Sequence, residues 1–330
     1  MEQLDQLNAK LEKAAASHPK AYHFRMWRMA WLSYLTAYGA VAFLVVLWVG
    51  LAALLGDLSN SLWVPLIMLV ILAGIIWRFR HLIFLKIDPP QARWLQRKEA
   101  PELFATIDEI SAKLRCAPLH EVGVSLDNNA FMQTVPRLGV IGRSHHYLVL
   151  GLPLLLGLPK EEGKAVIAHE LSHLSRSHGK IGAMLWRSRF LWNYISTASG
   201  QRKSHLARRL VGAANWILEW LNTSAVAALR QHEYEADKFA AKAMSAEIVA
   251  NALMRLETVS RFMERELWYE INLKPVFRSR PPQDILERME MALKKASSEG
   301  RLNKYLENAL MEGRGVFASL PTLRERVQAL

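Results

Sequence analysis

The chain has 330 residues, a net charge of +12, a hydrophobic content of 51% and 11 tryptophans. Its single cysteine, Cys116, excludes an internal disulfide and fits a reducing compartment. The basic residues flank long apolar segments, and no nucleic-acid-binding motif accompanies them. The charge therefore indicates contact with an anionic membrane surface and no nucleic-acid partner.

The N-terminal segment, residues 1–28, is predicted to be cytoplasmic and polar. Leu4, Leu7 and Leu11 recur at helical spacing within it. We expect an amphipathic helix over residues 1–24 that lies at the membrane surface.

The next segment, residues 29–86, is predicted to be a transmembrane hairpin. Residues 29–56 and 58–77 carry no charge, and each stretch can cross a hydrocarbon core of about 30 Å as a helix. Residues 57–61 form the expected turn. Two buried core helices are the alternative, but core helices of this length usually carry a polar face. The apolar run also begins too late, and is too long, for a cleaved signal peptide.

The basic residues around this hairpin predict its orientation. The turn carries one acid and no base. The basic residues lie before and after the hairpin: Lys20, Arg25, Arg28, Arg78, Arg80 and Lys86. Because Lys and Arg are enriched on the cytoplasmic side, both ends of the hairpin should lie in the cytoplasm. Residues 87–330 would then form a cytoplasmic domain.

This domain is predicted to begin with a helix and a small antiparallel sheet. Residues 101–114 have helical apolar spacing, and several short extended runs follow up to residue 150, with a hairpin turn at residues 142–145. An edge strand beside a catalytic site can hold an extended peptide by main-chain hydrogen bonds. Asn129, Ala130 and Phe131 are the candidates for this substrate-binding edge. A plain turn followed by a core strand is the equally weighted alternative.

The residues His169-Glu170-Leu171-Ser172-His173 read H-E-x-x-H. On a helix this spacing places both imidazoles on one face, where they can bind one Zn²⁺, and brings Glu170 within reach of a zinc-bound water. Proline and two acids upstream, and Gly179 downstream, are helix start and stop signals. They favour a metallopeptidase helix over the alternative of two surface histidines.

Residues 180–229 form a helical insertion that is harder to assign. Residues 181–199 and 210–229 are largely apolar, but the loop between them is strongly basic. An outward position for that loop would conflict with the cytoplasmic preference of basic residues. We expect two helices that pack over the active site or dip into the cytoplasmic face of the membrane.

A catalytic zinc needs a third protein ligand and an open position for water. Glu233 and Asp237 lie one helical turn apart on one face. One of them can bind the metal while the other accepts the free N–H of a ligand histidine.

Three stretches together, residues 128–131, 165–173 and 233–237, resemble the integral-membrane zinc metallopeptidases of the HtpX and CAAX-prenyl-protease type, as does the C-terminal run 320–327. The resemblance implies a gluzincin fold with one zinc per chain bound by His169, His173 and Glu233. It also implies that Glu170 is the general base and that Asp237 supports a ligand.

The expected fold is mainly α-helical with a small antiparallel sheet, an α+β core, plus the N-terminal transmembrane helical hairpin. The expected function is a membrane-anchored endopeptidase of the bacterial inner membrane that cleaves membrane or misfolded proteins. One alternative is a non-catalytic membrane adaptor with a closed zinc site, for which His145, His146 or His178 could supply a fourth ligand. The other is a prenyl-protein processing protease, which shares the chemistry.

Overall fold

The structure is a computed structural model that describes residues 15, 17–59, 63–83, 87–138, 141–174, 179–200, 204–269, 284–312 and 320–330. The first fourteen residues, which carry most of the expected N-terminal amphipathic helix, lie outside the described residues.

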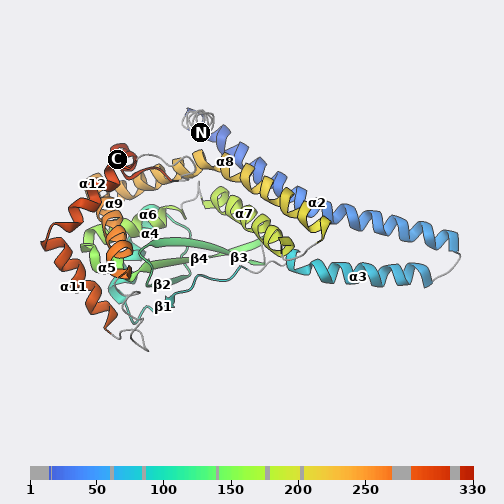
Figure 1. Cartoon of the computed structure of the whole chain (residues 1–330), viewed down its shortest axis with the longest axis horizontal. Coiled ribbons are helices and arrows are strands. Elements are labelled where there is room, and N and C mark those ends of the chain that lie inside the picture. The colour runs from blue at the N-terminus through green and yellow to red at the C-terminus, as the bar shows by residue number, and fades with distance from the viewer. Residues whose placement is uncertain are drawn as a thin grey trace.

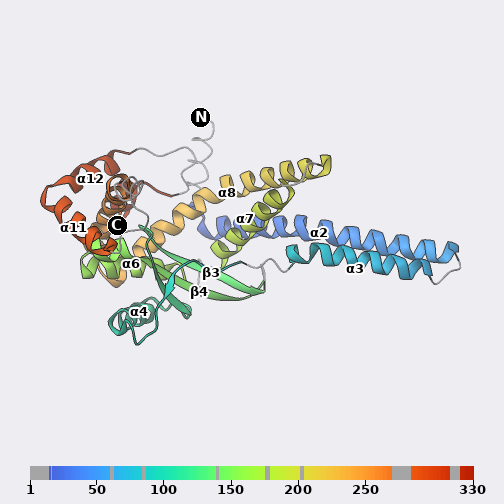
Figure 2. The same ribbon diagram turned by 60° about the horizontal axis from the view of Figure 1, so that its bottom comes forward.

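Two long apolar helices project from one end of the molecule, α2 (Pro19–Ser59) and α3 (Trp63–Ile83), and they lie side by side in both views (Figures 1 and 2). The Trp48 indole N–H donates to the Met68 carbonyl at 3.0 Å and ties them together. Within the described residues, Ala21–Leu55 of α2 is long and apolar enough to cross a membrane by length and composition. The helix continues to Ser59, past the start of the expected turn, because no proline follows Gly56 to stop it.

The two halves of α2 have different surroundings. In its first half, Met26 and Ala30 are fully buried against α7 (Gly179–Gly200) and α8 (His205–Ala243), and the Tyr22 hydroxyl donates to the Ser224 carbonyl at 2.8 Å. In its second half the apolar side chains are exposed, for example Val46 at 69%. The helix therefore belongs to the folded core at one end and presents a lipid-compatible surface at the other.

A four-stranded sheet has the order β1-β2-β4-β3, with β1 (Arg93–Trp94), β2 (Glu121–Ser125), β3 (Ala130–Leu138) and β4 (Ile141–Gly151). The expectation of an antiparallel sheet is wrong at one pair, because β2 and β4 run parallel. The chain passes from β2 to the edge strand β3 and returns as β4 between them, so the sheet is mixed.

The expected hairpin turn at residues 142–145 is also wrong. Ser144 and His145 lie within β4 and pair with Pro136 and Val135 of β3. The polar residues in this stretch resemble a turn in sequence, but one long strand absorbs them. Proline is tolerated in β3 because the strand lies at the edge of the sheet.

The helices α4 (Pro101–Leu114), α5 (Leu152–Gly157), α6 (Lys160–Ser172) and α9 (Ala246–Phe262) share a hydrophobic core with the sheet. A π-helical turn, η1 (Met263–Leu267), extends α9. The remaining described helices are α11 (Ile285–Ser298), α12 (Arg301–Met311) and α13 (Leu323–Ala329). The single 39-residue helix α8 joins the apolar run 210–229 to the acidic cluster that follows it.

The contact between α8 and α2 generates a stability prediction. Leu221 is fully buried in the cluster that joins the two helices. Leu221→Ala should cost about 2–5 kcal/mol because it leaves a cavity there, and should lower the melting temperature of the full chain in neutral detergent by several degrees. Leu210→Ala, at a position 46% exposed on the same helix, should change it little. Equal melting temperatures for the two variants would contradict this packing.

Candidate metal centre

Helix α6 places His169 and His173 together. Its N-terminal turn carries Glu161 and Glu162, which favour the positive end of the helix dipole, and Ala168 and Leu171 are fully buried in the core. The opposite side of the helix then presents the imidazoles, whose ring centroids lie 5.1 Å apart at 88°.

Glu233 reaches the two histidines from α8. Its carboxylate oxygens lie 3.4 Å from Nε2 of His169 and 3.8 Å from Nε2 of His173. One donor atom from each of the three residues lies within 4.8 Å of the others, so the group can hold a metal ion. Two imidazoles and one carboxylate are a donor set that catalytic zinc uses, and the expected ligands are thus brought together.

Asp237, one turn after Glu233, orients His169. Its Oδ1 lies 2.9 Å from Nδ1 of His169, which leaves Nε2 of that ring for a metal ion. Burial opposes ionisation of Asp237, but hydrogen bonds from Arg326 and His169 lower its pKa to about 2. The carboxylate is therefore charged and accepts hydrogen bonds throughout the neutral pH range.

The sequence reasoning missed Arg326. This residue lies on α13, and its Nε and Nη2 donate to the two carboxylate oxygens of Asp237 at 2.8 and 2.7 Å. Nη2 also lies 3.6 Å from Glu233. A capping box between Thr322 and Glu325 fixes the start of α13. Arg326 falls in the C-terminal run that carried the family resemblance, but its separation of 89 residues from Asp237 gave no sign of contact.

The protonation states in this group suit a cation. Burial lowers the pKa of His173 to about 4, so its imidazole is neutral. Although burial opposes ionisation of Glu233, its contacts with His169 lower its pKa to about 2. Burial also opposes protonation of His169, but its two carboxylate neighbours raise its pKa. A metal ion at Nε2 of His169 would replace that proton, so the residues fit a bound zinc.

Glu170 lies between the two histidines on α6 and next to the sheet. Burial raises its pKa to about 7, and the main-chain N–H of Met132 on β3 donates to it. A carboxylate with a pKa near neutrality can both accept and release a proton, which is the requirement for a general base that later acts as an acid.

The edge strand β3 runs beside this group. Because main-chain groups alternate sides along a strand, the outward N–H of Met132 implies that Ala130 also points its N–H away from β4. Pro136, which has no N–H, sits at the same parity. Asn129 precedes the strand, and Phe131 has the opposite parity. The backbone at Asn129 packs closely against Gly151 of β4. A Cβ at Gly151 would lie 2.6 Å from the Asn129 carbonyl oxygen, so this contact requires a glycine.

The possible fourth ligands lie elsewhere. His145 pairs with Glu121 at 3.2 Å and His146 with Thr134 at 3.0 Å. His178 lies outside the described residues. Among the described residues the metal-binding group therefore has three members, which leaves room for a water and a substrate.

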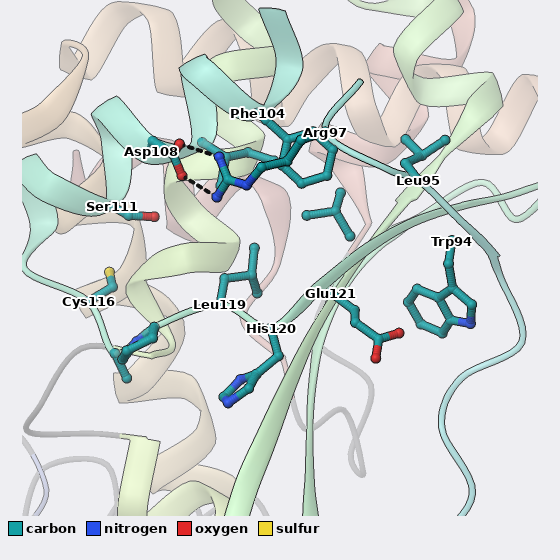
Figure 3. A pocket seen from close by; sticks show the side chains of 14 residues that line it. Trp94, Leu95, Arg97, Phe104, Asp108, Ser111, Cys116, Leu119, His120 and Glu121 are labelled. Atoms are coloured by element: carbon teal, nitrogen blue, oxygen red, sulfur yellow. Dashed lines mark hydrogen bonds and ion pairs between the residues drawn. The ribbon is translucent and has the colours of Figure 1, made fainter. Parts of the chain in front are cut away.

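Figure 3 shows a cavity of about 570 Å³ between α4, β1 and β2, lined by Trp94, Leu95, Arg97, Phe104, Ile107, Asp108, Ser111, Cys116, Ala117, Pro118, Leu119, His120, Glu121 and Val122. None of the metal-binding residues lines it. The cavity is therefore separate from the candidate metal centre. Its lining residue Cys116 does contact α6, because the thiol donates to the Leu171 carbonyl at 3.0 Å.

Residues 97–330 match the family model described as Peptidase family M48. Among solved structures, the chain matches the crystal structure of Ste24p from S. mikatae at 16% identity with a TM-score of 0.38. That match covers 93% of this chain and 66% of the Ste24p chain, so this chain spans just under two thirds of its length. No curated protein matches the chain.

The role of Asp237 can be tested against a second Asp–Arg pair. Asp237→Asn should lower zinc affinity about 10–100-fold, measured by chelator competition, because His169 loses the carboxylate that orients it. Asp108→Asn breaks a comparable but exposed pair with Arg97, whose closest atoms lie 2.6 Å apart, and should leave zinc affinity unchanged. Equal zinc affinities in the two variants would show that Asp237 does not support zinc binding.

Proposed function

The chain belongs to peptidase family M48 and is a metallopeptidase, and on that premise we propose that it is a membrane-anchored zinc endopeptidase. His169, His173 and Glu233 would hold the zinc. The convergence of their donor atoms within 4.8 Å carries this proposal. Asp237 would fix the ring of His169, and Arg326 would hold Asp237 in place.

The proposed reaction is hydrolysis of a peptide bond. Zinc supplies Lewis-acid chemistry, which polarises a carbonyl and lowers the pKa of water. Glu170 accepts the proton of the attacking water and passes it to the leaving amine. Its burial beside the metal-binding residues, and its pKa of about 7, support this role.

We propose that β3 holds the substrate as an added strand. Its outer edge lies beside Glu170, and the Ala130 N–H, which points the same way, would bond to an extended peptide. Ala130 is only 5% exposed and packs in the core shared with α6, so a substrate would reach this N–H only at the margin of that core. Asn129 and Phe131 flank this position and would shape the cleft around the substrate side chains. Main-chain recognition of this kind suits an endopeptidase that acts on many extended or unfolded segments.

The proposed substrates are membrane proteins and misfolded proteins on the cytoplasmic side of the bacterial inner membrane. Helix α2 supports this, because it belongs to the catalytic core at one end and exposes a continuous apolar surface at the other. A metal centre built on a helix that packs against α2 stays close to the bilayer. Segments that leave the membrane unfolded would then meet the cleft at high local concentration.

Glu170→Gln tests the chemistry. The variant should bind one zinc per chain and lower kcat/KM on an unfolded model protein about 100- to 10,000-fold, because the amide cannot accept the proton. Glu161→Gln on the first turn of the same helix, where the side chain is exposed and paired with Lys164, should retain activity. A zinc-loaded Glu170→Gln variant that cleaves as fast as the native chain would refute the mechanism.

Ala130→Pro tests the substrate edge. Proline removes the outward N–H without removing a bond to β4, so kcat/KM of the folded, zinc-loaded variant should fall about tenfold or more. Because Ala130 is only 5% exposed, the larger ring should also lower the melting temperature somewhat. Phe131→Pro should lower the melting temperature further, because its N–H belongs to the β3–β4 ladder by parity. Unchanged kinetics in a folded Ala130→Pro variant would exclude β3 as the binding edge.

A further inference from the structure

Arg187 on α7 carries a charge that no carboxylate balances in the part of the chain that the structure describes. Its Nη2 donates to the Ser144 hydroxyl of β4 at 2.7 Å. Its Nε is buried and has no hydrogen-bond partner. No ion pair joins Arg187 to a carboxylate within the described residues. A half-buried guanidinium without a counter-charge favours an anion beside it, and such an anion would meet the terminal nitrogens, because Nε has no accessible surface.

Within the described residues, the acid that contacts the histidines beside Arg187 is Glu121, which is paired with His145 at 3.2 Å. Tyr34 of α2 is the electrostatic neighbour of Arg187 on one side. On the sheet side lies His146, whose pKa burial lowers to about 4, with further lowering from His120, His145 and Arg187. His146 is therefore neutral near pH 7 and does not offset the charge of Arg187.

The position of Arg187 on the molecule is defined by its neighbours. Ser188, the next residue, contacts Ser33 of α2 through their hydroxyls, and the Tyr34 hydroxyl donates to the Met184 carbonyl at 3.4 Å. Ala37, which is 7% exposed, is the last α2 residue buried in the cluster with α7 and α8, and beyond Tyr38 the apolar side chains of α2 are mainly exposed. Figures 1 and 2 both place α7 at the inner half of α2 and not beside its outer half. Arg187 thus lies where α2 leaves the folded core.

A series of aromatic rings lies along the part of α2 that is close to Arg187. Trp27, Trp31, Tyr34 and Tyr38 form a continuous series of ring contacts, with neighbouring centroids 5.9 to 6.4 Å apart. Trp and Tyr are enriched where a helix crosses the boundary between hydrocarbon and water. Phosphate groups of phospholipids lie at that boundary, so the anion closest at hand for Arg187 is a lipid headgroup.

We propose that Arg187 binds the phosphate group of an anionic phospholipid at the junction of α2, α7 and β4. The guanidinium is suited to this ligand, because its planar fork can donate two parallel hydrogen bonds to a phosphate. Ser144 holds one nitrogen and so restricts the orientation of the fork. The lipid would anchor the catalytic domain at a fixed height and tilt over the bilayer. This inference does not depend on the metal chemistry.

Native mass spectrometry of the full chain in neutral detergent tests the site. Phosphatidylglycerol and phosphatidylcholine are added at equal mole fraction, and lipid adducts are counted. The native chain should retain one phosphatidylglycerol at least about tenfold more strongly than phosphatidylcholine, and Arg187→Gln should lose that preference. Arg189→Gln is the matched control, since it removes the same charge two positions along α7, on the far side of the helix, and should behave as the native chain.

Two further variants guard against misfolding of Arg187→Gln. Arg187→Lys keeps a charge but not the fork, and Ser144→Ala removes the orienting hydroxyl, so each should retain phosphatidylglycerol several-fold less strongly than the native chain. Native retention in both would overturn the proposal, as would equal loss in Arg189→Gln. Competition by inorganic phosphate at the same concentration as the lipid would show a site for soluble phosphate and would overturn its assignment to a lipid.

Discussion

The ion pair between Arg326 and Asp237 is the interaction on which the geometry of the candidate metal centre depends. It joins α13 to α8, while Asp237 in turn contacts the ring of His169 on α6. Three helices far apart in sequence are therefore fixed relative to one another by one buried carboxylate. The charge of Asp237 is stable there because the guanidinium compensates the desolvation that would otherwise neutralise it.

The sequence predicted the parts of this centre that lie on regular helices. The spacing of His169, Glu170 and His173 defines one helix face, and Glu233 with Asp237 defines another. The choice of Glu233 over Asp237 as the metal ligand came from the family resemblance. Arg326 could not be placed, because its contact depends on how α13 packs and no periodicity encodes that. The same limit applied to the sheet: alternation indicated extended strands, but the insertion of β4 between β2 and β3 is a property of the whole fold.

Helices α2 and α8 link the membrane-facing part of the molecule to the chemistry. Each is about forty residues long, the inner half of α2 packs against α8, and the C-terminal part of α8 carries Glu233 and Asp237. The hydrophobic cluster around Leu221 joins them, so α2 cannot tilt independently of the helix that carries Glu233. An anionic lipid at Arg187 would act on the same cluster from the membrane side. The position of the candidate metal centre relative to the bilayer would then depend on the packing of α2 against α8 and on the charge of Arg187.

The coordination of zinc in the purified full chain tests the central claim most directly. X-ray absorption spectroscopy combined with metal analysis counts the ligands and identifies their elements. Our account predicts one zinc per chain with two imidazole nitrogens, and oxygen atoms in the remaining positions. A third imidazole, a sulfur ligand, or a chain that binds no zinc would contradict a catalytic centre formed by His169, His173 and Glu233.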